Sequence, residues 1–473
     1  MDFKSIPAFK SKPHIAVLTD ICNEPDDAES MTRFLLYANE FNIDALIATT
    51  STWQRYSTHK DEIHKIVDAY AGVIGNLNTH VPPSRQYPSP DSLRSLIRSG
   101  LNGYGMPAAR GLISEGTELL IRAVDGCDLI WVLIWSGANV LAQALLEIQR
   151  TRSATELESF VSKIRVYAIS DQDDAGPWIR LHFPKMFYIS SIHAFNYYGM
   201  AAWTGISGES YYGFHPGGPD SSLVTKEWIK KNIQIGPYGS VYPDHAFIPE
   251  GDTPTFLSLI QNGLTNPLKP EWGGWGGRYN LTDPSGESLH YSDAADAVVG
   301  KDGKTHVGSQ ATIWRWREAY QGDFSARIQW TLTPNFTSAN HAPLIVLNGD
   351  AGLEALHIKV GFGETVTLDA SQSWDPDGDD LEFKWMHYRE PTATQWATRF
   401  EVPELGFEDV SVKRNMEKVE VKMPDQDAGI KFPLDETKIM KYGAKTYHLI
   451  LEVLDNGKNP MRSYRRVLVE VAA

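Results

Sequence analysis

Cysteine is almost absent from this chain of 473 residues. Cys22 and Cys127 are too few for a disulfide framework, so the fold has to be held together by packing. No apolar run approaches the length of a membrane span, and we expect no membrane partner. The opening M-D-F-K-S-I-P-A-F-K also lacks the apolar segment of a signal peptide. We therefore expect a cytoplasmic location if the chain is complete and an extracellular one if it has been trimmed.

Positive charge is scarce relative to negative charge. The 44 lysines and arginines against 59 acidic residues give a net charge of −15 and a pI near 5.4. Binding to a phosphate backbone needs a basic surface, so nucleic acid is not an expected partner. A neutral or cationic small molecule fits this balance better. The length predicts two or three domains, and the sequence leaves open whether the chain forms a homo-oligomer.

Residues 14 to about 190 alternate short apolar runs with helical patterns. This alternation predicts right-handed βαβ units, hence an α/β fold with a mostly parallel open sheet and flanking helices. The expected strands are residues 15–18, 43–49, 129–135, 164–169 and 186–189. The expected helices are residues 28–39, 58–71, 115–124, 138–149 and 175–182.

The rest of the chain changes character twice. Aromatic residues and glycines crowd residues 195–335, and we interpret the set as a rim that stacks on sugars, while core packing is equally favoured for any single tryptophan. Residues 334–342 have no periodicity and predict a linker between an α/β domain at 1–333 and a small all-β Ig-like or PKD-like sandwich at 343–473. The strands expected in the sandwich are residues 365–369, 381–385, 418–422, 447–453 and 466–471.

A cluster of acids follows the first expected strand. Asp20, Glu24, Asp26 and Asp27 stand between residues 15–18 and a helical pattern that starts at position 28. Open α/β sheets bind ligands at the carboxyl ends of their strands, so these acids favour a site over a solvated turn. Carboxylates from one loop can hold a hard divalent cation, which would lower the pKa of a bound water.

A metal shell would need further ligands from elsewhere in the chain. The expected strand at 129–135 ends in Ser136, where an exposed main-chain carbonyl is a candidate ligand. Asp252 precedes an apolar helical run at 256–260 and is a candidate carboxylate. Its local sequence favours a helix N-cap instead, because Asp before Thr-Pro serves that role well.

The pattern T-D-x-x-x-x-P-D-D-A at 19–28 resembles the amino-terminal signature of the nucleoside hydrolases. In that family an aspartate of this loop activates a calcium-bound water that attacks the anomeric carbon of a nucleoside. The resemblance implies Ca²⁺ as cofactor, with Asp20 as metal ligand and general base and Asp26 as the contact to sugar hydroxyls. The other implied metal ligands are Asp27, the main-chain oxygen of Ser136, and Asp252.

Longer motifs resemble a subgroup, the nucleoside-hydrolase-like proteins named for a cellulose-binding homologue. The motifs are I-S-D-Q-D-D-A-G-P-W-I-R at 169–180, W-T-G-I-S-G at 203–208, E-G-D-T-P-T-F-L at 250–257, W-G-G-W-G-G-R-Y at 272–279, A-T-I-W-R-W-R-E-A at 311–319 and D-A-S-Q-S-W-D-P-D-G-D at 369–379. The resemblance covers nearly the whole chain and implies a hydrolase-like domain followed by an Ig-like domain. The aspartates of the last motif favour a loop cap over a cation site.

Some positions depart from the nucleoside hydrolase pattern. The acid loop is two residues longer, Gly251 replaces a histidine that helps the base to leave, and residues 172–174 replace a ribose-binding E-F-N segment. These departures make a glycan with an oxygen leaving group at least as plausible as a purine nucleoside, and such a group needs a proton donor. The candidate donors are Asp173 and Glu250. The candidate substrate-binding residues are Gln172, Asp174, Trp178 and Trp203, with core packing equally favoured for the two tryptophans.

Two functions stay open at this point. The first is a calcium-dependent hydrolase of a glycosidic bond, in a glycoside or an N-glycoside. The second is a non-catalytic protein that binds carbohydrate, such as a cellulose-like polysaccharide, on the same scaffold. Only the first requires Asp20, Asp27 and Asp252 to converge on one metal. A purely structural or partner-binding role is a third and weaker hypothesis.

Overall fold

The computed structural model describes residues 10–193, 197–393, 402–425, 430–432, 435–440 and 445–472. The chain divides into two compact units. The α/β unit contains Phe9–Ile260 and Asn266–Phe336, and the β unit contains Gln261–Thr265 and Thr337–Ala473. Within the described ranges, no helix combines the length and the apolar character needed to cross a membrane.

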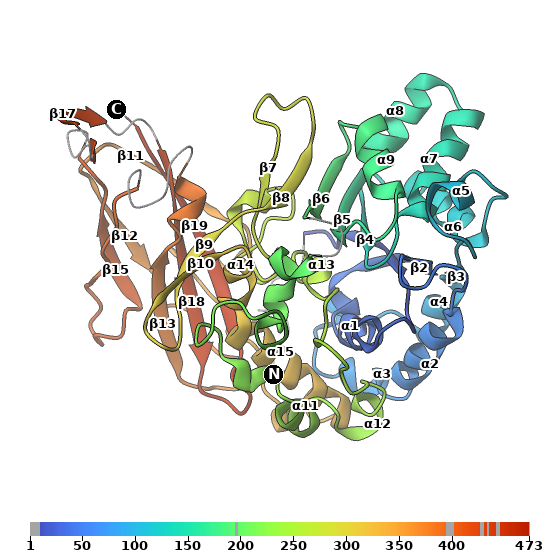
Figure 1. Ribbon diagram of the computed structural model, residues 1–473. Coiled ribbons are helices and arrows are strands. Elements are labelled where there is room, and N and C mark those ends of the chain that lie inside the picture. The colour runs from blue at the N-terminus through green and yellow to red at the C-terminus, as the bar shows by residue number, and fades with distance from the viewer. Residues whose placement is uncertain are drawn as a thin grey trace. The chain divides into compact units, whose positions relative to one another are not determined.

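The α/β unit is built on an eight-stranded sheet with the order β3-β2-β1-β4-β5-β6-β8-β7 (Figure 1). The strands are β1 His14–Thr19, β2 Asn42–Ala48, β3 Ile97–Ser99, β4 Ile130–Ile134, β5 Ile164–Ser170, β6 Phe187–Ser191, β7 Tyr279–Leu281 and β8 His290–Asp293. Neighbouring strands are parallel except for the antiparallel pair of β7 and β8. The mostly parallel sheet predicted from the sequence is confirmed.

Helices connect and flank these strands, as predicted. They are α1 Pro25–Leu35, α2 Lys60–Ala71, α3 Ile74–Leu77, α4 Pro90–Ser95, α5 Gly105–Ala109, α6 Glu115–Asp125, α7 Asn139–Thr151, α8 Ala154–Ser162, α9 Ala175–His182, α10 Glu209–Tyr212, α11 Lys226–Asn232, α12 Gly236–Gly239, α13 Pro254–Leu257, α14 Ala311–Trp314 and α15 Arg317–Leu332. A two-stranded hairpin, β9 Asp296–Val299 and β10 Thr305–Gly308, completes the unit.

The first helix begins earlier than the sequence predicted. Pro25 occupies the first helical position, where its fixed φ and missing N–H are tolerated, and Asp26 and Asp27 fall in the first turn. The helical pattern in the sequence predicted this helix at 28–39, with the acids in a loop before it. The difference matters for function, because the helix holds Asp26 and Asp27 more rigidly than a loop would.

The strand order places a ligand crevice beside β1. From β1 the chain continues to β2 and β3 on one side, whereas β4, β5 and β6 extend the sheet on the other side. Such a reversal leaves a crevice at the carboxyl ends of the two central strands, here β1 and β4. Both strands are buried along almost their whole length, so the crevice has a rigid base.

The β unit contains one four-stranded sheet, β11-β19-β18-β13, one three-stranded sheet, β12-β15-β14, and a two-stranded sheet, β16-β17. Its strands are β11 Leu356–Val360, β12 Thr365–Asp369, β13 Leu381–His387, β14 Glu408–Asp409, β15 Lys418–Lys422, β16 Ile430–Phe432, β17 Asp435–Met440, β18 Lys445–Asp455 and β19 Arg462–Val471. Alternate residues of the two larger sheets, such as Leu368, Val419, Leu451 and Val469, pack into one core. The all-β character predicted for this region is confirmed.

Candidate active site

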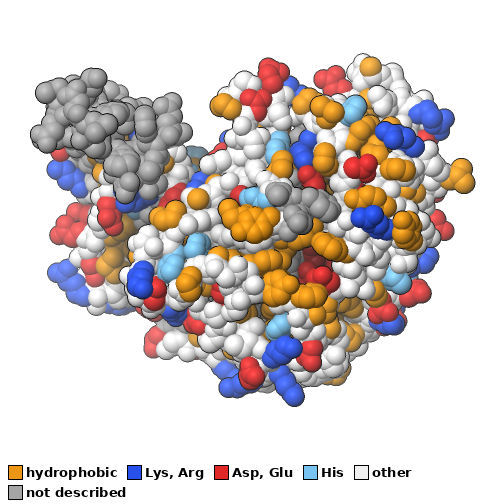
Figure 2. All heavy atoms as spheres, viewed as in Figure 1, with side chains coloured by type: hydrophobic (Ala, Val, Ile, Leu, Met, Phe, Trp, Pro, Cys, Tyr) orange, Lys and Arg blue, Asp and Glu red, His pale blue; other side chains and the backbone are white. Residues whose placement is uncertain are grey.

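A cavity of about 730 Å³ lies at the carboxyl edge of the parallel sheet. Its lining includes Asp20 after β1, Trp135 after β4, and Ser170 at the end of β5. Among the residues that the structure describes, the acidic ones that line it are Asp20, Glu24, Asp26, Asp27 and Asp252. Figure 2 shows a hollow near the centre of the view with acidic side chains at its base and hydrophobic side chains around it.

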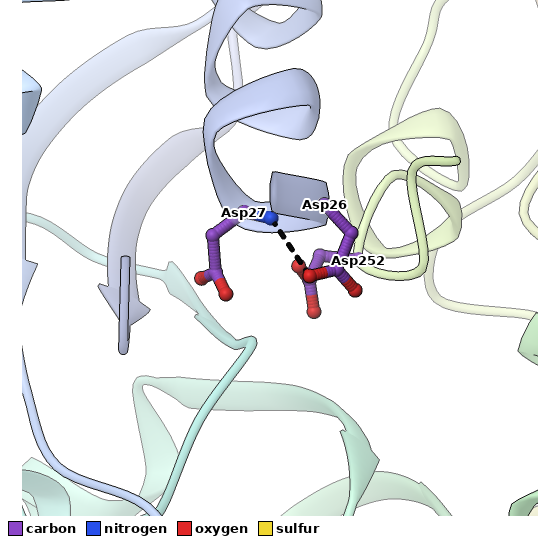
Figure 3. Close-up of side chains that lie close together, drawn as sticks. All are labelled: Asp26, Asp27 and Asp252. Atoms are coloured by element: carbon purple, nitrogen blue, oxygen red, sulfur yellow. Dashed lines mark hydrogen bonds between the residues drawn. The ribbon is translucent and has the colours of Figure 1, made fainter. Parts of the chain in front are cut away.

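Three of these carboxylates gather at one point. Asp26 and Asp27 extend from the first turn of α1, and Asp252 extends from the turn before α13 (Figure 3). One carboxylate oxygen from each lies within 4.8 Å of the others. Asp27 and Asp252 belong both to this group and to the ligand set implied by the sequence, whereas Asp26 was expected to contact a sugar.

The surroundings of Asp27 and Asp252 fit a cation with hard oxygen ligands. Asp27 is 3% exposed, and the Thr19 hydroxyl at the end of β1 donates a hydrogen bond to its Oδ1. Asp252 is 1% exposed, and its Oδ2 is buried without a hydrogen-bond partner. An unpaired carboxylate oxygen in such a place is unfavourable. A divalent cation such as Ca²⁺ would satisfy it.

Burial and mutual repulsion both raise the pKa values of these carboxyl groups. Burial is the largest cause that raises the pKa of Asp27 and of Asp252 well above the ordinary value, and the other acids of the cavity raise it further. Asp20 is among the charges that raise the pKa of both side chains. The carboxylates therefore repel one another strongly when no positive charge lies between them.

Asp20 lies in the same cavity but outside the group of three. It is 2% exposed, and its Oδ2 accepts a hydrogen bond of 2.5 Å from the Ser51 hydroxyl. Burial raises the pKa of Asp20 to about 7, against the lowering effect of the Ser51 hydrogen bond. The hydrogen bond thus holds the side chain in a defined orientation.

A buried ion pair fixes the segment that carries Asp252. Arg33 of α1 donates a hydrogen bond of 2.6 Å to Glu250, and the Glu250 N–H donates one of 2.8 Å to Glu29 of α1. Glu250 also has a left-handed φ of 61°, which these contacts stabilise. Glu250, a predicted proton donor, is engaged in this network and does not line the acidic cavity. Asp252 makes no N-cap, because the cap position of α13 is Thr253.

Asp173 and Asp174 bind backbone groups near the starts of helices. Asp173 Oδ1 accepts hydrogen bonds from the N–H groups of Ala138 and Ala175, next to α7 and α9. Asp174 accepts one from the Met106 N–H in α5. Neither aspartate lines the cavity, although burial raises the pKa of Asp173 to about 7. The structure therefore does not bring the predicted donor Asp173 to the acid cluster.

The other predicted site residues divide between the cavity and the core. Gln172 lines the cavity and donates a hydrogen bond of 2.7 Å to the Trp135 carbonyl. It belongs to residues 172–174, which replace the ribose-binding E-F-N segment of the nucleoside hydrolases. Trp203 also lines it and donates to the Ser170 hydroxyl. Ser136 is fully buried and is not among the lining residues. Trp178 lies outside the cavity and stacks on His182.

Aromatic side chains surround the acids, but they are mostly not the tryptophans of the sequence motifs. Trp275, Trp314 and Trp316 are 1–5% exposed and do not line the cavity, so for them the core-packing alternative holds. The lining aromatic residues are Trp53, Trp135, Tyr197, Tyr198, Trp203, Tyr211, Tyr212, Phe214 and Phe247. The tyrosines of this wall were not predicted, and the adjacent pairs at 197–198 and 211–212 are the sequence signal that could have found them.

Two family models match the chain. The model described as "Cellulose-binding Sde182, nucleoside hydrolase-like domain" matches residues 14–279. The model described as "Cellulose-binding protein Sde0182, C-terminal domain" matches residues 365–471. No curated protein matches the chain.

One similar solved structure is a nucleoside hydrolase-related hypothetical protein from Saccharophagus degradans, described as associated with carbohydrate metabolism. It is 31% identical, the match covers 98% of this chain and 100% of that one, and the TM-score is 0.76. Another match, the effector protein XOO4466, is 10% identical over 70% of this chain and 96% of its own, with a TM-score of 0.30, which is too low to indicate a shared fold.

Proposed function

The chain belongs to the cellulose-binding Sde182 family, whose domain at 14–279 is nucleoside hydrolase-like, and from this premise we propose that it hydrolyses a glycosidic bond. The reaction would take place in the acidic cavity with Ca²⁺ as cofactor. The observation that carries the proposal is the convergence of Asp26, Asp27 and Asp252, with one buried carboxylate oxygen of Asp252 left without a donor.

The residues that would hold the cation are Asp27 and Asp252, together with Asp26 and the neighbouring Asp20. Their oxygen atoms are the hard ligands that calcium prefers. When bound, the cation would supply charge that lowers the pKa of a water in the cavity. The chain's own contribution is to fix these carboxylates through Thr19, Ser51 and the Arg33–Glu250 pair.

Asp20 is the proposed general base. Its carboxylate lies at the floor of the cavity and is oriented by the Ser51 hydroxyl. The Asp20 carboxylate is buried beside the proposed cation, whose charge would keep it ionised and able to accept a proton. Asp20 would take the proton from the water that attacks the anomeric carbon.

Glu24 is the proposed proton donor to an oxygen leaving group. Glu24 lines the cavity, and burial raises the pKa of its carboxyl group. Although it occupies the N-cap position of α1, its side chain makes no capping hydrogen bond. Glu24 replaces Asp173 and Glu250 in this role, because both of those carboxylates are held by other parts of the chain.

A carbohydrate is the proposed substrate class. Gly251 cannot assist a departing nucleobase as a histidine would, and aromatic side chains rather than an E-F-N segment line the cavity. Aromatic faces give flat apolar area for sugar rings. The names of the family and of its solved relative point the same way, towards cellulose binding and carbohydrate metabolism.

The test is a calcium-supplemented screen of aryl glycosides, furanosides and nucleosides with the parent chain and with Asp20→Asn. We expect kcat to fall by roughly 10²–10⁴-fold in Asp20→Asn, as for loss of a general base. Asp61→Asn, an exposed aspartate on α2, is the control and should keep the parent rate. Unchanged turnover in Asp20→Asn would remove Asp20 from the mechanism.

A non-catalytic carbohydrate-binding protein is the second candidate function. The wall of aromatic residues favours it independently of the acids, because stacking on sugars needs no chemistry. Binding of glycans without turnover of any substrate in the screen would support this function and exclude the hydrolase.

A further inference from the structure

The lining of the acidic cavity changes from buried to exposed between its floor and its mouth. At the floor, Asp20, Asp27 and Asp252 are 1–3% exposed. At the mouth, the large side chains Trp53 and Tyr211 are 55% and 57% exposed although they belong to the same lining. A ligand that touches both levels must extend from the buried acids to the solvent, and a single sugar ring cannot do this as well as a chain of sugars.

The mouth is formed by aromatic residues from separate parts of the α/β unit. Trp53 follows β2 and contacts Tyr198 edge-on, with 6.4 Å between the ring centroids. Tyr211 of α10 contacts Phe247 in the same manner at 5.6 Å. Large apolar side chains left this exposed around one cavity indicate a ligand-binding surface rather than ordinary surface residues.

Buried side chains close the floor of the cavity. The Trp135 indole lines the cavity, donates a hydrogen bond to Thr255 and packs against Phe256, and all three residues are at most 1% exposed. A chain that reaches the acids therefore cannot continue past them, so it has to enter by one of its ends.

The charge of the lining selects against acidic ligands. Five carboxylates line the cavity, and the part of the chain that the structure describes places no Lys or Arg side chain in that lining. Uronic acids, sulfated sugars and nucleotides would all be repelled. The surface fits an uncharged chain whose rings present flat C–H faces to aromatic side chains.

We propose that the cavity binds one end of a neutral oligosaccharide, with the terminal sugar at the aspartates and the following sugars on Trp53, Tyr211 and Phe247. The inference rests on the proposed function only for the cleavage step. If the bond is cleaved, the protein removes single sugars from a chain end. The binding mode itself requires no catalysis.

The test measures binding by calorimetry in the parent and in Asp20→Asn, so that affinity is obtained with and without turnover. The probes are linear cello-, xylo- and manno-oligosaccharides of one to six units, and tetrasaccharides that carry a bulky cap at either the reducing or the non-reducing end. We expect the affinity for one series to rise about tenfold or more from one to four units. A cap at one end only should abolish binding.

The variants Trp53→Ala and Tyr211→Ala should lose this gain with chain length and keep the affinity for the single sugar. Tyr56→Ala is the matched control, because Tyr56 lies three residues from Trp53, is 79% exposed and does not line the cavity. An affinity that does not depend on length, equal binding of both capped chains, equal effects of Trp53→Ala and Tyr56→Ala, or no binding in any series would each overturn the proposal.

The outcome also separates this inference from the hydrolase proposal. Length-dependent binding by one chain end without turnover would keep the binding mode and exclude hydrolysis. Turnover of aryl glycosides or nucleosides without any length dependence would keep hydrolysis and overturn the binding mode.

Discussion

Each acid of the cavity has different immediate neighbours, and these neighbours set what its carboxylate can do. Ser51 donates to Asp20 and Thr19 donates to Asp27, whereas one oxygen of Asp252 has no donor. A carboxylate with a hydroxyl donor keeps a fixed direction and a lower pKa than burial alone would give. Asp252 lacks this compensation at Oδ2, and so it is the residue most dependent on a cation.

At the scale of the residue, Glu24→Gln tests the proposed proton donor. We expect kcat/KM for an alkyl glycoside to fall by roughly 10²–10⁴-fold, because its alkoxide leaves poorly without a proton. A 4-nitrophenyl glycoside should be affected much less, since nitrophenolate leaves unprotonated. Steady-state kinetics on both substrates give the comparison, with the exposed Glu115→Gln as control. An equal loss on both substrates would assign Glu24 another role.

At the scale of the elements, the site depends on how short helices are held by their neighbours. The helix α13 after Asp252 has four residues, too few to be stable alone, so its position depends on its neighbours. Arg33 and Glu29 of α1 fix the turn before it through Glu250. Because Asp26 and Asp27 are on α1, the same contacts set the separation between the two acidic segments.

The packing of α13 against Gly276 gives a prediction at this scale. A Cβ at position 276 would lie 2.3 Å from the Pro254 carbonyl oxygen and 2.6 Å from the Ser258 nitrogen. Gly276→Ala should therefore displace α13, lower the free energy of unfolding by about 1–3 kcal/mol and weaken calcium binding. Thermal unfolding and a calcium titration measure the two effects.

Gly75→Ala is the control for this substitution, because nothing lies within 4 Å of its added Cβ. An alanine at an exposed helical position should leave stability equal or slightly higher. Normal calcium affinity in a folded Gly276→Ala protein would show that Asp252 does not depend on α13 for its position.

For the whole molecule, the clustered carboxylates predict an unusual dependence of stability on pH. Burial raises the pKa of Asp20 and of Asp26 from 3.8 to about 7, so between these values the folded state binds more protons than the unfolded state. In calcium-free buffer the free energy of unfolding should therefore fall as the pH rises from about 4 to 7. Acidification back to about pH 4 should restore it. Calorimetric scans with a chelator measure this slope.

Calcium should reverse the effect, because a cation bound only by the folded state stabilises it by mass action. We expect the unfolding temperature at pH 7.5 to rise with calcium in the parent, and to rise much less in Asp27→Asn. The same variant should be more stable than the parent without calcium, since one of the mutually repelling charges is gone. A calcium response that is equal in both proteins would place the ion elsewhere.

The elements that the sequence predicted well are those whose pattern is local. The strand at 164–169 and the helix at 175–182 were found within a residue, because apolar strands and amphipathic helices carry their own periodicity. The helix α8 was missed although Ser153 and Glu156 form a capping box, and β3 was missed because three residues hold no pattern. The start of α1 was placed three residues late, because its first turn carries the acids of the site.

The sequence by itself determined which chemical groups are available. It places acids at the end of the first strand, has fewer basic than acidic residues, and contains motifs that identify the family. What only the tertiary structure decided is which of these groups meet. Asp252 is more than 220 residues from Asp27 in the chain and yet reaches it, whereas Asp173 and Glu250 are turned into other contacts. The physical reason is that the sequence gives the chemical type of each side chain, whereas the direction in which the side chain points depends on how the helices and strands pack together.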